Sequence, residues 1–391
     1  MTHPLNPSDD PGFGPAHLPY GVFAPADGPP RVGVRIAGHV LDLSAALGDP
    51  EFAAASLNPF MARGRAFWSE TRSRITGLLA DDAAAAHLHP LADVRLRLPF
   101  EVADYVDFYC SLEHATNLGR MFRPDEEPLK PNWRHLPVGY HGRAGTVFAS
   151  GTEITRPHGQ RVTPGVAAPE YGGSRKLDFE AEVGFVVGVP TEAGETVPPE
   201  RFADHVFGVV LVNDWSARDV QAFEYVPLGP FLGKSFATTV GAWVTPLEAL
   251  EAARVPGPRQ DPEPLDYLRP KEPWGLDLTL EVHVNGTRVS EPPYAGMYWT
   301  PDQMLAHLTA NGARLRTGDL FASGTVSGPA HGQRGSLIEL SWNGAEPVVL
   351  ADGTTRTFLE DGDTVVLTAS ATATDGGALT LAEAAGTVVA R

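Results

Sequence analysis

Three short segments of the sequence carry acidic side chains whose types and spacing could bind a cation. Asp107 lies in a segment rich in aromatic residues, Glu180 and Glu182 alternate within an apolar run, and Asp214 ends another apolar run. No His-rich or Cys-rich set accompanies these carboxylates, so they would offer oxygen ligands, which suit Mg²⁺ or Ca²⁺ better than Zn²⁺. We therefore predict that these four carboxylates hold a hard divalent cation.

Each of these carboxylates also has a simpler interpretation. Glu180 and Glu182 would sit ~7 Å apart on the outer face of a strand, where water separates them at little cost. Asp214 can cap a helix predicted to follow it. The spacing alone does not establish that the three segments converge.

Other reactive side chains lie close to these acids in the sequence. Arg218, Gln221 and Tyr225 share one face of the helix expected after Asp214, because they are three and seven residues apart. Cys110 and His114 could form a thiol–imidazole pair, but no Asn partner or activating helix N-terminus is evident. A small buried side chain is the simpler interpretation of Cys110. No P-loop, dinucleotide fingerprint or convincing Gly-x-Ser-x-Gly element is present.

The elements that must position these groups are mainly strands. Alternating or continuous apolar residues predict strands over 177–187, 206–212, 278–284, 336–342 and 363–371. The run at 206–212 is almost wholly apolar, which is typical of a strand buried on both faces. A helix is predicted over 301–310, because Thr300 and Gln303 match a capping box and Asn311-Gly312 closes the segment.

Residues 1–98 are expected to form a separate small unit. Val32, Val34 and Ile36 alternate before Gly38, which predicts a hairpin continuing to Leu41 and Leu43. A helix is expected over 57–79, and an alternating strand over 94–98. No cluster of reactive residues appears in this region, so we interpret it as a packing or dimerisation module.

Composition limits the class of protein. The 391 residues include 41 Gly and 36 Pro among many short alternating runs, which favours a mainly β protein with some helix (α+β). The formal charge of −18 argues against nucleic-acid binding. The single cysteine excludes an intrachain disulfide and fits a cytoplasmic location. We see neither a secretory signal nor a stretch apolar enough to span a membrane.

Read together, these segments resemble the fumarylacetoacetase (fumarylacetoacetate hydrolase) family. Order and spacing hold from about Asp104 to the C-terminus, and weaker similarity reaches into the first unit. The matching stretches are 107–109 with 114–117, 131–143, 178–182, 213–220, 224–236, 323–325 and 339–342. Long stretches in the right order are stronger evidence than any isolated motif.

The resemblance implies a fold and a reaction. It implies a small SH3-like barrel over 1–98 and a larger mixed β-roll carrying the catalytic site over 99–391, acting as a homodimer. The implied reaction is hydrolysis of the carbon–carbon bond of 4-fumarylacetoacetate to fumarate and acetoacetate, the last step of tyrosine and phenylalanine breakdown. Mg²⁺, Ca²⁺ or both would serve as the cation, and the sequence does not choose between them.

The resemblance also assigns roles by position. His114 would be the general base, oriented by Glu339, which the strand prediction places opposite the apolar Ile338 and Leu340. The groups implied to stabilise the oxyanion are Arg218, Gln221 and Lys234. The implied cation ligands are Asp107, Glu180, Glu182 and Asp214, with Lys234 and Thr238 near a second ion. The implied substrate-binding set is Tyr109, Arg123, Tyr140, Gln221, Tyr225 and Thr325.

One departure and two alternatives complete the sequence prediction. Residues 110–113, Cys-Ser-Leu-Glu, differ from the expected pattern, although no assigned position changes. An acylpyruvate-type hydrolase or decarboxylase could share the cation site, but would lack much of the neighbourhood of His114, Arg123 and Tyr140. A catalytically silent metal-stabilised module is the third possibility, and the retained base and oxyanion groups argue against it.

Overall fold

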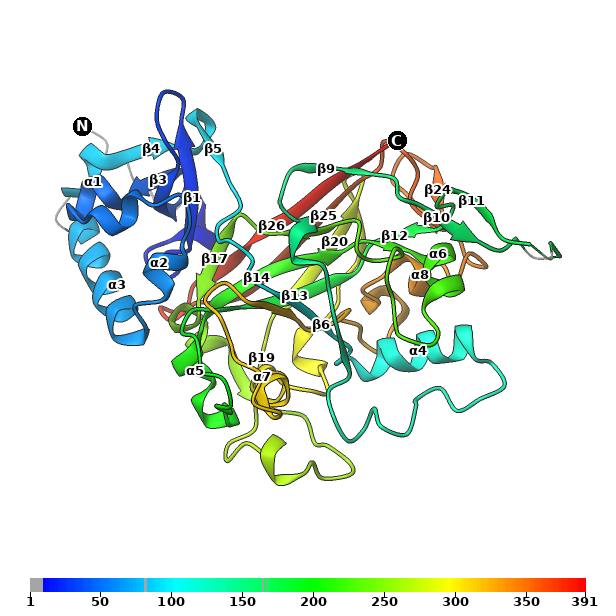
Figure 1. The fold of residues 1–391 in the computed structure, drawn as a ribbon. Coiled ribbons are helices and arrows are strands. Elements are labelled where there is room, and N and C mark those ends of the chain that lie inside the picture. The colour runs from blue at the N-terminus through cyan, green and yellow to red at the C-terminus, as the bar shows by residue number, and fades with distance from the viewer. Residues whose placement is uncertain (1–9, 81–82, 164, 167) are drawn as a thin grey trace.

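The computed structural model describes residues 10–80, 83–163, 165–166 and 168–391, and it is a mixed α+β fold built mostly from sheet. In Figure 1 the N-terminal elements form a lobe beside a larger body of long strands. The predicted mainly β class with some helix is confirmed. The predicted hairpin is also present, with strands β2 (Arg31–Ile36) and β3 (His39–Asp42) in antiparallel register.

Among its described residues, the N-terminal lobe combines five short strands with three α-helices. The remaining strands are β1 (Tyr20–Pro25), β4 (Leu88–Pro90) and β5 (Val94–Leu96). The helices are α1 (Leu43–Leu47), α2 (Asn58–Met61) and α3 (Arg65–Ala80). The helical stretch predicted over 57–79 is present but divided into α2 and α3, because Gly64 adopts a left-handed φ of 81° between them. Leu43 begins α1 and does not continue the hairpin.

A 13-stranded sheet runs through both parts of the molecule. Its main path is β4-β3-β2-β1-β17-β14-β13-β22-β6-β7, and β5, β8 and β16 pair beside this path. The lobe joins the body where Tyr20 pairs with Val244 and Gly21 with Trp243. The strands of the body in this sheet are β6 (Tyr105–Phe108), β7 (Gly139–His141), β8 (Val147–Ala149), β13 (Ala181–Val187), β14 (Val206–Asp214), β16 (Thr238–Val240), β17 (Trp243–Pro246) and β22 (Leu320–Ala322).

A second sheet covers one face of the first. Its five strands lie in the order β21-β20-β25-β26-β9, and β26 packs against β14, β16 and β17. The interior between such sheets excludes water, which explains why every residue of β14 is buried. The strands are β9 (Thr152–Thr155), β20 (Thr279–Val284), β21 (Thr287–Ser290), β25 (Thr364–Thr372) and β26 (Ala378–Val389).

Short elements and helices surround these sheets. The helices are α4 (Leu112–Phe122), α5 (Phe202–His205), α6 (Arg218–Glu224), α7 (Pro301–Thr309) and α8 (Leu337–Leu340). The paired short strands are β10 (His158–Arg161) with β11 (Glu170–Gly173), β12 (Leu177–Asp178) with β15 (Ser216–Ala217), β18 (Arg254–Pro256) with β19 (Trp274–Leu276), and β23 (Val348–Val349) with β24 (Thr355–Arg356).

The strand predictions have mixed outcomes. Those at 206–212, 278–284 and 363–371 are confirmed by β14, β20 and β25. The helix predicted at 301–310 is confirmed by α7, where the Gln303 side chain accepts the Thr300 N–H. The strand at 177–187 is interrupted, because Phe179 and Glu180 lie between β12 and β13. The strand at 336–342 was wrong, since this segment forms the short helix α8.

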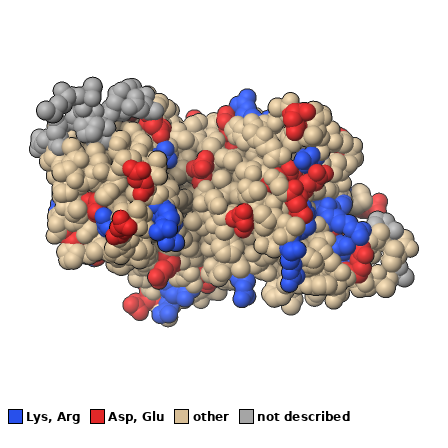
Figure 2. Space-filling view, turned by 90° about the horizontal axis from the view of Figure 1, so that it is seen from above, with Lys and Arg blue, Asp and Glu red and all other residues tan. Residues whose placement is uncertain are grey.

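The surface carries both signs of charge. On the face shown in Figure 2, acidic and basic side chains are interspersed among uncharged residues. None of the helices in the described part of the chain is both long and apolar enough to span a lipid bilayer.

Candidate active site

Four carboxylates from separate parts of the chain meet inside the body. Asp107 comes from β6, Glu180 from the short link between β12 and β13, Glu182 from β13, and Asp214 from the end of β14. Each offers one oxygen, and these oxygens all lie within 4.8 Å of one another. All four residues are at most 5% exposed, so the solvated strand face considered for Glu180 and Glu182 is excluded. Asp214 does not cap a helix either, because α6 begins after Ala217.

The electrostatics of this cluster fit a bound cation. Burial, followed by the charge of Asp107, raises the pKa of Glu182 well above its usual range, and burial followed by Asp214 does the same for Asp107. Neither carboxylate oxygen of Glu182 has a hydrogen-bond partner among the described residues. Buried oxygens that lack donors are costly unless a cation coordinates them. The donor set, which is all oxygen, therefore fits a hard divalent ion.

Lys234 neutralises the other side of the cluster. Its ammonium donates to Asp214 Oδ2 at 2.6 Å and also to Glu180. Burial alone would lower the pKa of Lys234, but Asp214 and Glu180 outweigh it and raise the pKa above its usual value. The Lys234 side chain is therefore a buried ammonium ion beside the carboxylates. The Thr238 hydroxyl donates to Asp214 Oδ1 at 2.9 Å, and the Tyr140 hydroxyl to Asp214 Oδ2 at 2.9 Å.

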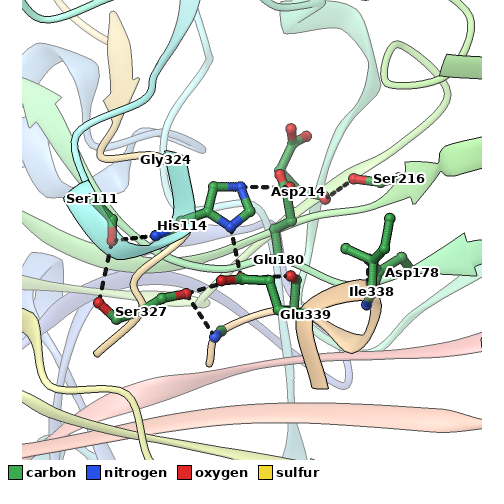
Figure 3. Close-up of polar contacts among 12 residues, drawn as sticks. Ser111, His114, Asp178, Glu180, Asp214, Ser216, Gly324, Ser327, Ile338 and Glu339 are labelled. Atoms are coloured by element: carbon green, nitrogen blue, oxygen red, sulfur yellow. Dashed lines mark hydrogen bonds and ion pairs between the residues drawn. The ribbon is translucent and has the colours of Figure 1, made fainter. Parts of the chain in front are cut away.

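His114 lies between two acids. It belongs to α4, which Ser111 caps by accepting the His114 N–H. The Nδ1 atom lies 2.6 Å from Glu339 Oε2, and Nε2 lies 3.6 Å from Glu180 Oε1. Figure 3 shows His114 and Glu339 pointing toward one another, with Ser327 beside them. Because a carboxylate only accepts, Nδ1 carries a proton, and Nε2 is left as the ring nitrogen toward the carboxylate cluster.

Glu339 stays ionised although it is fully buried. Burial would raise the pKa of Glu339, but the neighbouring His114 and several hydrogen bonds lower it below its usual value. Asn117 Nδ2 donates to one oxygen at 2.9 Å, and the hydroxyls of Ser327 and Ser336 donate to the other at 2.9 and 2.8 Å. Glu339 lies on helix α8, so the predicted alternation with Ile338 and Leu340 along a strand does not explain its orientation.

Arg218 and Gln221 face the same space from α6. Arg218 Nη2 donates to Glu180 Oε1 at 2.7 Å, and Nη1 donates to Gln221 Oε1 at 3.2 Å. Burial would raise the pKa of Glu180, but Arg218 and Lys234 outweigh it and hold the pKa well below its usual range. Because the Gln221 oxygen accepts from Arg218, its amide N–H groups remain as donors.

One cavity of about 420 Å³ brings most of the predicted residues together. Arg123 Nε and Thr325 Oγ1, both in its lining, are buried and have no partner among the described residues. Such groups are suited to a polar ligand. The predicted residues in the lining are Asp107, Tyr109, His114, Arg123, Tyr140, Glu180, Glu182, Arg218, Gln221, Tyr225, Lys234 and Thr325.

The remaining predicted residues lie next to this cavity. Asp214 and Thr238 line a neighbouring hollow of about 120 Å³, and Tyr140 and Lys234 line both spaces. Glu339 is fully buried behind His114. The thiol–imidazole alternative does not fit, because burial raises the pKa of Cys110 well above its usual value and favours an inert thiol.

Sequence reasoning missed several residues that hold the site in place. Asp178 accepts from Arg218 Nε at 2.8 Å, and Asn117, Ser327 and Ser336 surround Glu339. Asp178 and Asn117 lie inside matched stretches, so their polarity was a usable signal. Ser327 and Ser336 carry no local signal, because serine is common in loops.

Two family models match most of the chain. Residues 104–389 match the family described as Fumarylacetoacetate (FAA) hydrolase C-terminal, and residues 16–99 match Fumarylacetoacetase N-terminal. The chain is 46% identical to the fumarylacetoacetase of Rattus norvegicus, an alignment covering 92% of each chain. It is 48% identical to that of Caenorhabditis elegans with 90% of each covered, and 44% identical to that of Arabidopsis thaliana with 92% of each covered.

Solved structures share the fold at lower identity. A fumarylacetoacetate hydrolase from Exiguobacterium antarcticum superposes with a TM-score of 0.57 at 20% identity, covering 96% of this chain and 100% of the other. A maleylpyruvate hydrolase from Sphingobium sp. SYK-6, solved with manganese(II) and pyruvate, gives 0.52 at 20% identity, covering 95% and 99%. These likenesses establish the fold of the body.

Proposed function

The chain belongs to the fumarylacetoacetase family, and from this premise we propose how it hydrolyses 4-fumarylacetoacetate to fumarate and acetoacetate. The observation that carries the proposal is that the His114–Glu339 pair meets the four-carboxylate cluster, with His114 and three of the carboxylates lining one cavity. Water attack on a diketo acid requires a general base and a cation site that face the same cavity. We place the reaction as the final step of tyrosine and phenylalanine breakdown.

His114 is the proposed general base. Its Nε2 atom removes a proton from water as the water oxygen bonds to the carbonyl carbon on the fumaryl side. The imidazolium that forms is stabilised by Glu339, which already accepts from Nδ1 at 2.6 Å. Since Glu339 is held as an anion by its own donors, it does not need to take the proton itself.

Arg218, Gln221 and Lys234 are the proposed oxyanion groups. The carbonyl electron pair moves onto oxygen during the attack, and donors placed beforehand stabilise that charge more than water would. The Gln221 amide is oriented for this role, because its oxygen is occupied by Arg218. A cation bound to Asp107, Glu180, Glu182 and Asp214 would supply Lewis-acid polarisation of the β-diketo oxygens.

Breaking the carbon–carbon bond is the difficult step. The electron pair of that bond leaves with the acetoacetate half as an enolate, while the other carbon becomes the carboxyl group of fumarate. A proton must then reach the enolate carbon, and the buried ammonium of Lys234 is the proposed donor. The His114 imidazolium then gives up its proton and the neutral Lys234 takes one up, which restores both groups for the next cycle.

The proposed substrate-binding residues are polar groups around the cavity. Arg123 suits a substrate carboxylate, because a guanidinium can bind two oxygens at once and its Nε lacks a partner among the described residues. Tyr109 packs edge-on against the His114 ring at 5.3 Å, so it also limits how the base can tilt. The full proposed set is Tyr109, Arg123, Tyr140, Gln221, Tyr225 and Thr325.

Mg²⁺ and Ca²⁺ are the proposed cations. Both prefer oxygen ligands, and they differ in the size and rigidity of the site they need. We propose a second ion near Lys234 and Thr238, since the hollow beside Asp214 is lined by both residues.

One assay tests the proposed function. Purified protein is incubated with fumarylacetoacetate, and loss of the ultraviolet absorbance of the conjugated diketone is followed. We expect turnover that a chelator abolishes and Mg²⁺ or Ca²⁺ restores. Absence of turnover with either ion present would refute the proposal, and turnover only of an acylpyruvate would favour the related hydrolase instead.

We also propose the organisation of the chain. Residues 1–98 would form an SH3-like unit and 99–391 the catalytic β-roll. The family matches at 16–99 and 104–389 support a boundary near residue 99.

A homodimer is supported by exposed apolar side chains on α6 and the segment after it, at Phe223, Val226, Leu228, Phe231 and Leu232. Sedimentation should give about twice 41.7 kDa, and a monomer would contradict the homodimer. A cytoplasmic location fits the single, buried Cys110.

A further inference from the structure

We propose that Asp178 is a positioning residue. It fixes the His114–Glu339 pair relative to the oxyanion groups Arg218 and Gln221. Its carboxylate is fully buried on β12. It contacts α6, which carries Arg218 and Gln221, and α8, which carries Glu339. The inference rests on the proposed function, because it concerns how two parts of that site are kept in register. It adds a role for a residue outside the base, oxyanion, substrate and cation sets.

The contacts of Asp178 reach in two directions. Toward α6, its Oδ2 accepts from Arg218 Nε at 2.8 Å. Toward α8, Oδ1 accepts the Leu337 N–H at 2.7 Å and Oδ2 accepts the Ile338 N–H at 3.1 Å. Figure 3 shows Asp178 beside Ile338, at the start of the helix that carries Glu339. One carboxylate therefore joins the helix of the oxyanion groups to the helix of Glu339.

The N-cap of α8 explains why a remote carboxylate is needed there. Ser336 occupies the N-cap position, where a serine side chain usually accepts an N–H from the first turn of its own helix. Here the Ser336 hydroxyl instead donates to Glu339 Oε2 at 2.8 Å and makes no cap hydrogen bond. Asp178 accepts the first two N–H groups of the helix in its place. The Ser336 hydroxyl is thus free to help hold Glu339.

Arg218 depends on Asp178 in a comparable way. Its Nη2 and Nη1 are directed to Glu180 and Gln221, and Nε is the nitrogen that Asp178 holds. A guanidinium fixed at all three nitrogens cannot rotate in its plane, so the Gln221 amide is fixed too. Misplacement by about 1 Å at such groups can cost about 100-fold in rate. Asp178 is therefore expected to affect turnover without touching substrate.

The test compares Asp178→Asn with the wild-type enzyme. Asparagine has nearly the same shape, but its amide nitrogen must face either Arg218 or the N–H groups of α8, all of which are donors. We expect kcat per folded molecule to fall about 10- to 100-fold, with KM within about threefold of wild type. In the Glu339→Gln background the same change should cost a smaller factor, because one of the groups it positions is already disabled.

A matched control separates positioning from a general loss of stability. Asp363 is also a buried carboxylate, and it accepts from Arg356 Nε at 2.8 Å and from the Glu360 N–H at 2.7 Å, outside the cavity lining. Asp363→Asn should lower the unfolding midpoint while leaving kcat per folded molecule unchanged. If Asp178→Asn does not yield folded protein, Asp178→Ser is assayed in the same way.

The outcomes distinguish this inference from the proposed function. An active wild-type enzyme whose Asp178 variant keeps normal kcat would overturn the positioning role alone. A kcat loss equal in both the wild-type and Glu339→Gln backgrounds would also overturn it, since the effect would not act through Glu339. An inactive wild-type enzyme would overturn the proposed function first, and the positioning role with it.

Discussion

His114 Nδ1 lies 2.6 Å from Glu339 Oε2, although 225 positions separate the two residues in the chain. The contact joins the first turn of α4 to the short helix α8. Ser111 and Ser327 support it from both sides, because Ser111 caps α4 and donates to the Ser327 carbonyl, and the Ser327 hydroxyl donates to Glu339. The ring of His114 is therefore held in one orientation and one tautomer.

Replacing His114 with alanine should lower kcat by at least about 100-fold, the usual scale for loss of a general base. The measurement is steady-state turnover of fumarylacetoacetate with divalent ion present. His135→Ala is the control, because His135 is exposed and lies outside the cavity lining. Near-normal turnover in His114→Ala would refute the assigned base.

Replacing Glu339 with glutamine should also lower kcat by about 100-fold or more, with KM nearly unchanged. The neutral amide cannot stabilise the imidazolium, and it can present N–H to a ring nitrogen that must itself donate. Glu346→Gln is the control, since Glu346 is a surface acid paired loosely with His331 at 3.7 Å. A Glu339→Gln enzyme with wild-type kcat would remove Glu339 from the mechanism.

Glu182→Gln should abolish stabilisation by the cation without destabilising the cation-free protein. Burial and the charge of Asp107 raise the pKa of Glu182, so the cation-free site already favours a neutral side chain at this position. Ion at about 100-fold above its Kd should stabilise the wild-type protein by about 2.7 kcal/mol. Thermal unfolding with and without Mg²⁺ or Ca²⁺ measures this effect.

Asp302→Asn is the control for that experiment. Asp302 is buried on α7, where it accepts from the Gln303 N–H at 3.0 Å, away from the carboxylate cluster. The variant should keep the full rise in unfolding midpoint on adding ion. If Glu182→Gln also kept that rise, Glu182 would not be a ligand.

His17 should make the protein less stable as the pH falls below about 6.5. Burial lowers the pKa of His17 from 6.5 to about 3, and the charges of Arg72 and Arg35 add to this effect, although the hydrogen bond to Gly12 O at 2.9 Å opposes it. Between these two values the unfolded chain binds a proton that the folded protein does not. The loss of stability is therefore about 1.4 kcal/mol per pH unit over that range.

Urea unfolding of wild type and His17→Gln from pH 7.5 to pH 4.5 tests this sign. The glutamine variant should lose less stability per pH unit, whatever its stability at neutral pH. His39→Gln serves as the control, because His39 is only partly buried. Equal slopes for His17→Gln and wild type would show that His17 is not the cause.

Local patterns predicted those features that neighbouring residues decide. The buried strand β14 follows from a run of apolar side chains, and α7 follows from a capping box whose Thr300–Gln303 hydrogen bond forms within one turn. The prediction at 336–342 failed because a short apolar run fits a strand or a buried helix equally well. Asp178 then stabilised the helical alternative by accepting the Leu337 and Ile338 N–H groups.

The sequence by itself determined the chemistry available at the site, namely oxygen ligands, an imidazole and the cationic side chains of Arg218 and Lys234, because side-chain type is a local property. Only the tertiary structure decided that Asp107, Glu180, Glu182 and Asp214 share one point, and that Glu339 reaches His114 from α8. The physical reason is that convergence depends on strand register and on the packing of elements distant in the chain. Spacing along a single segment carries neither kind of information.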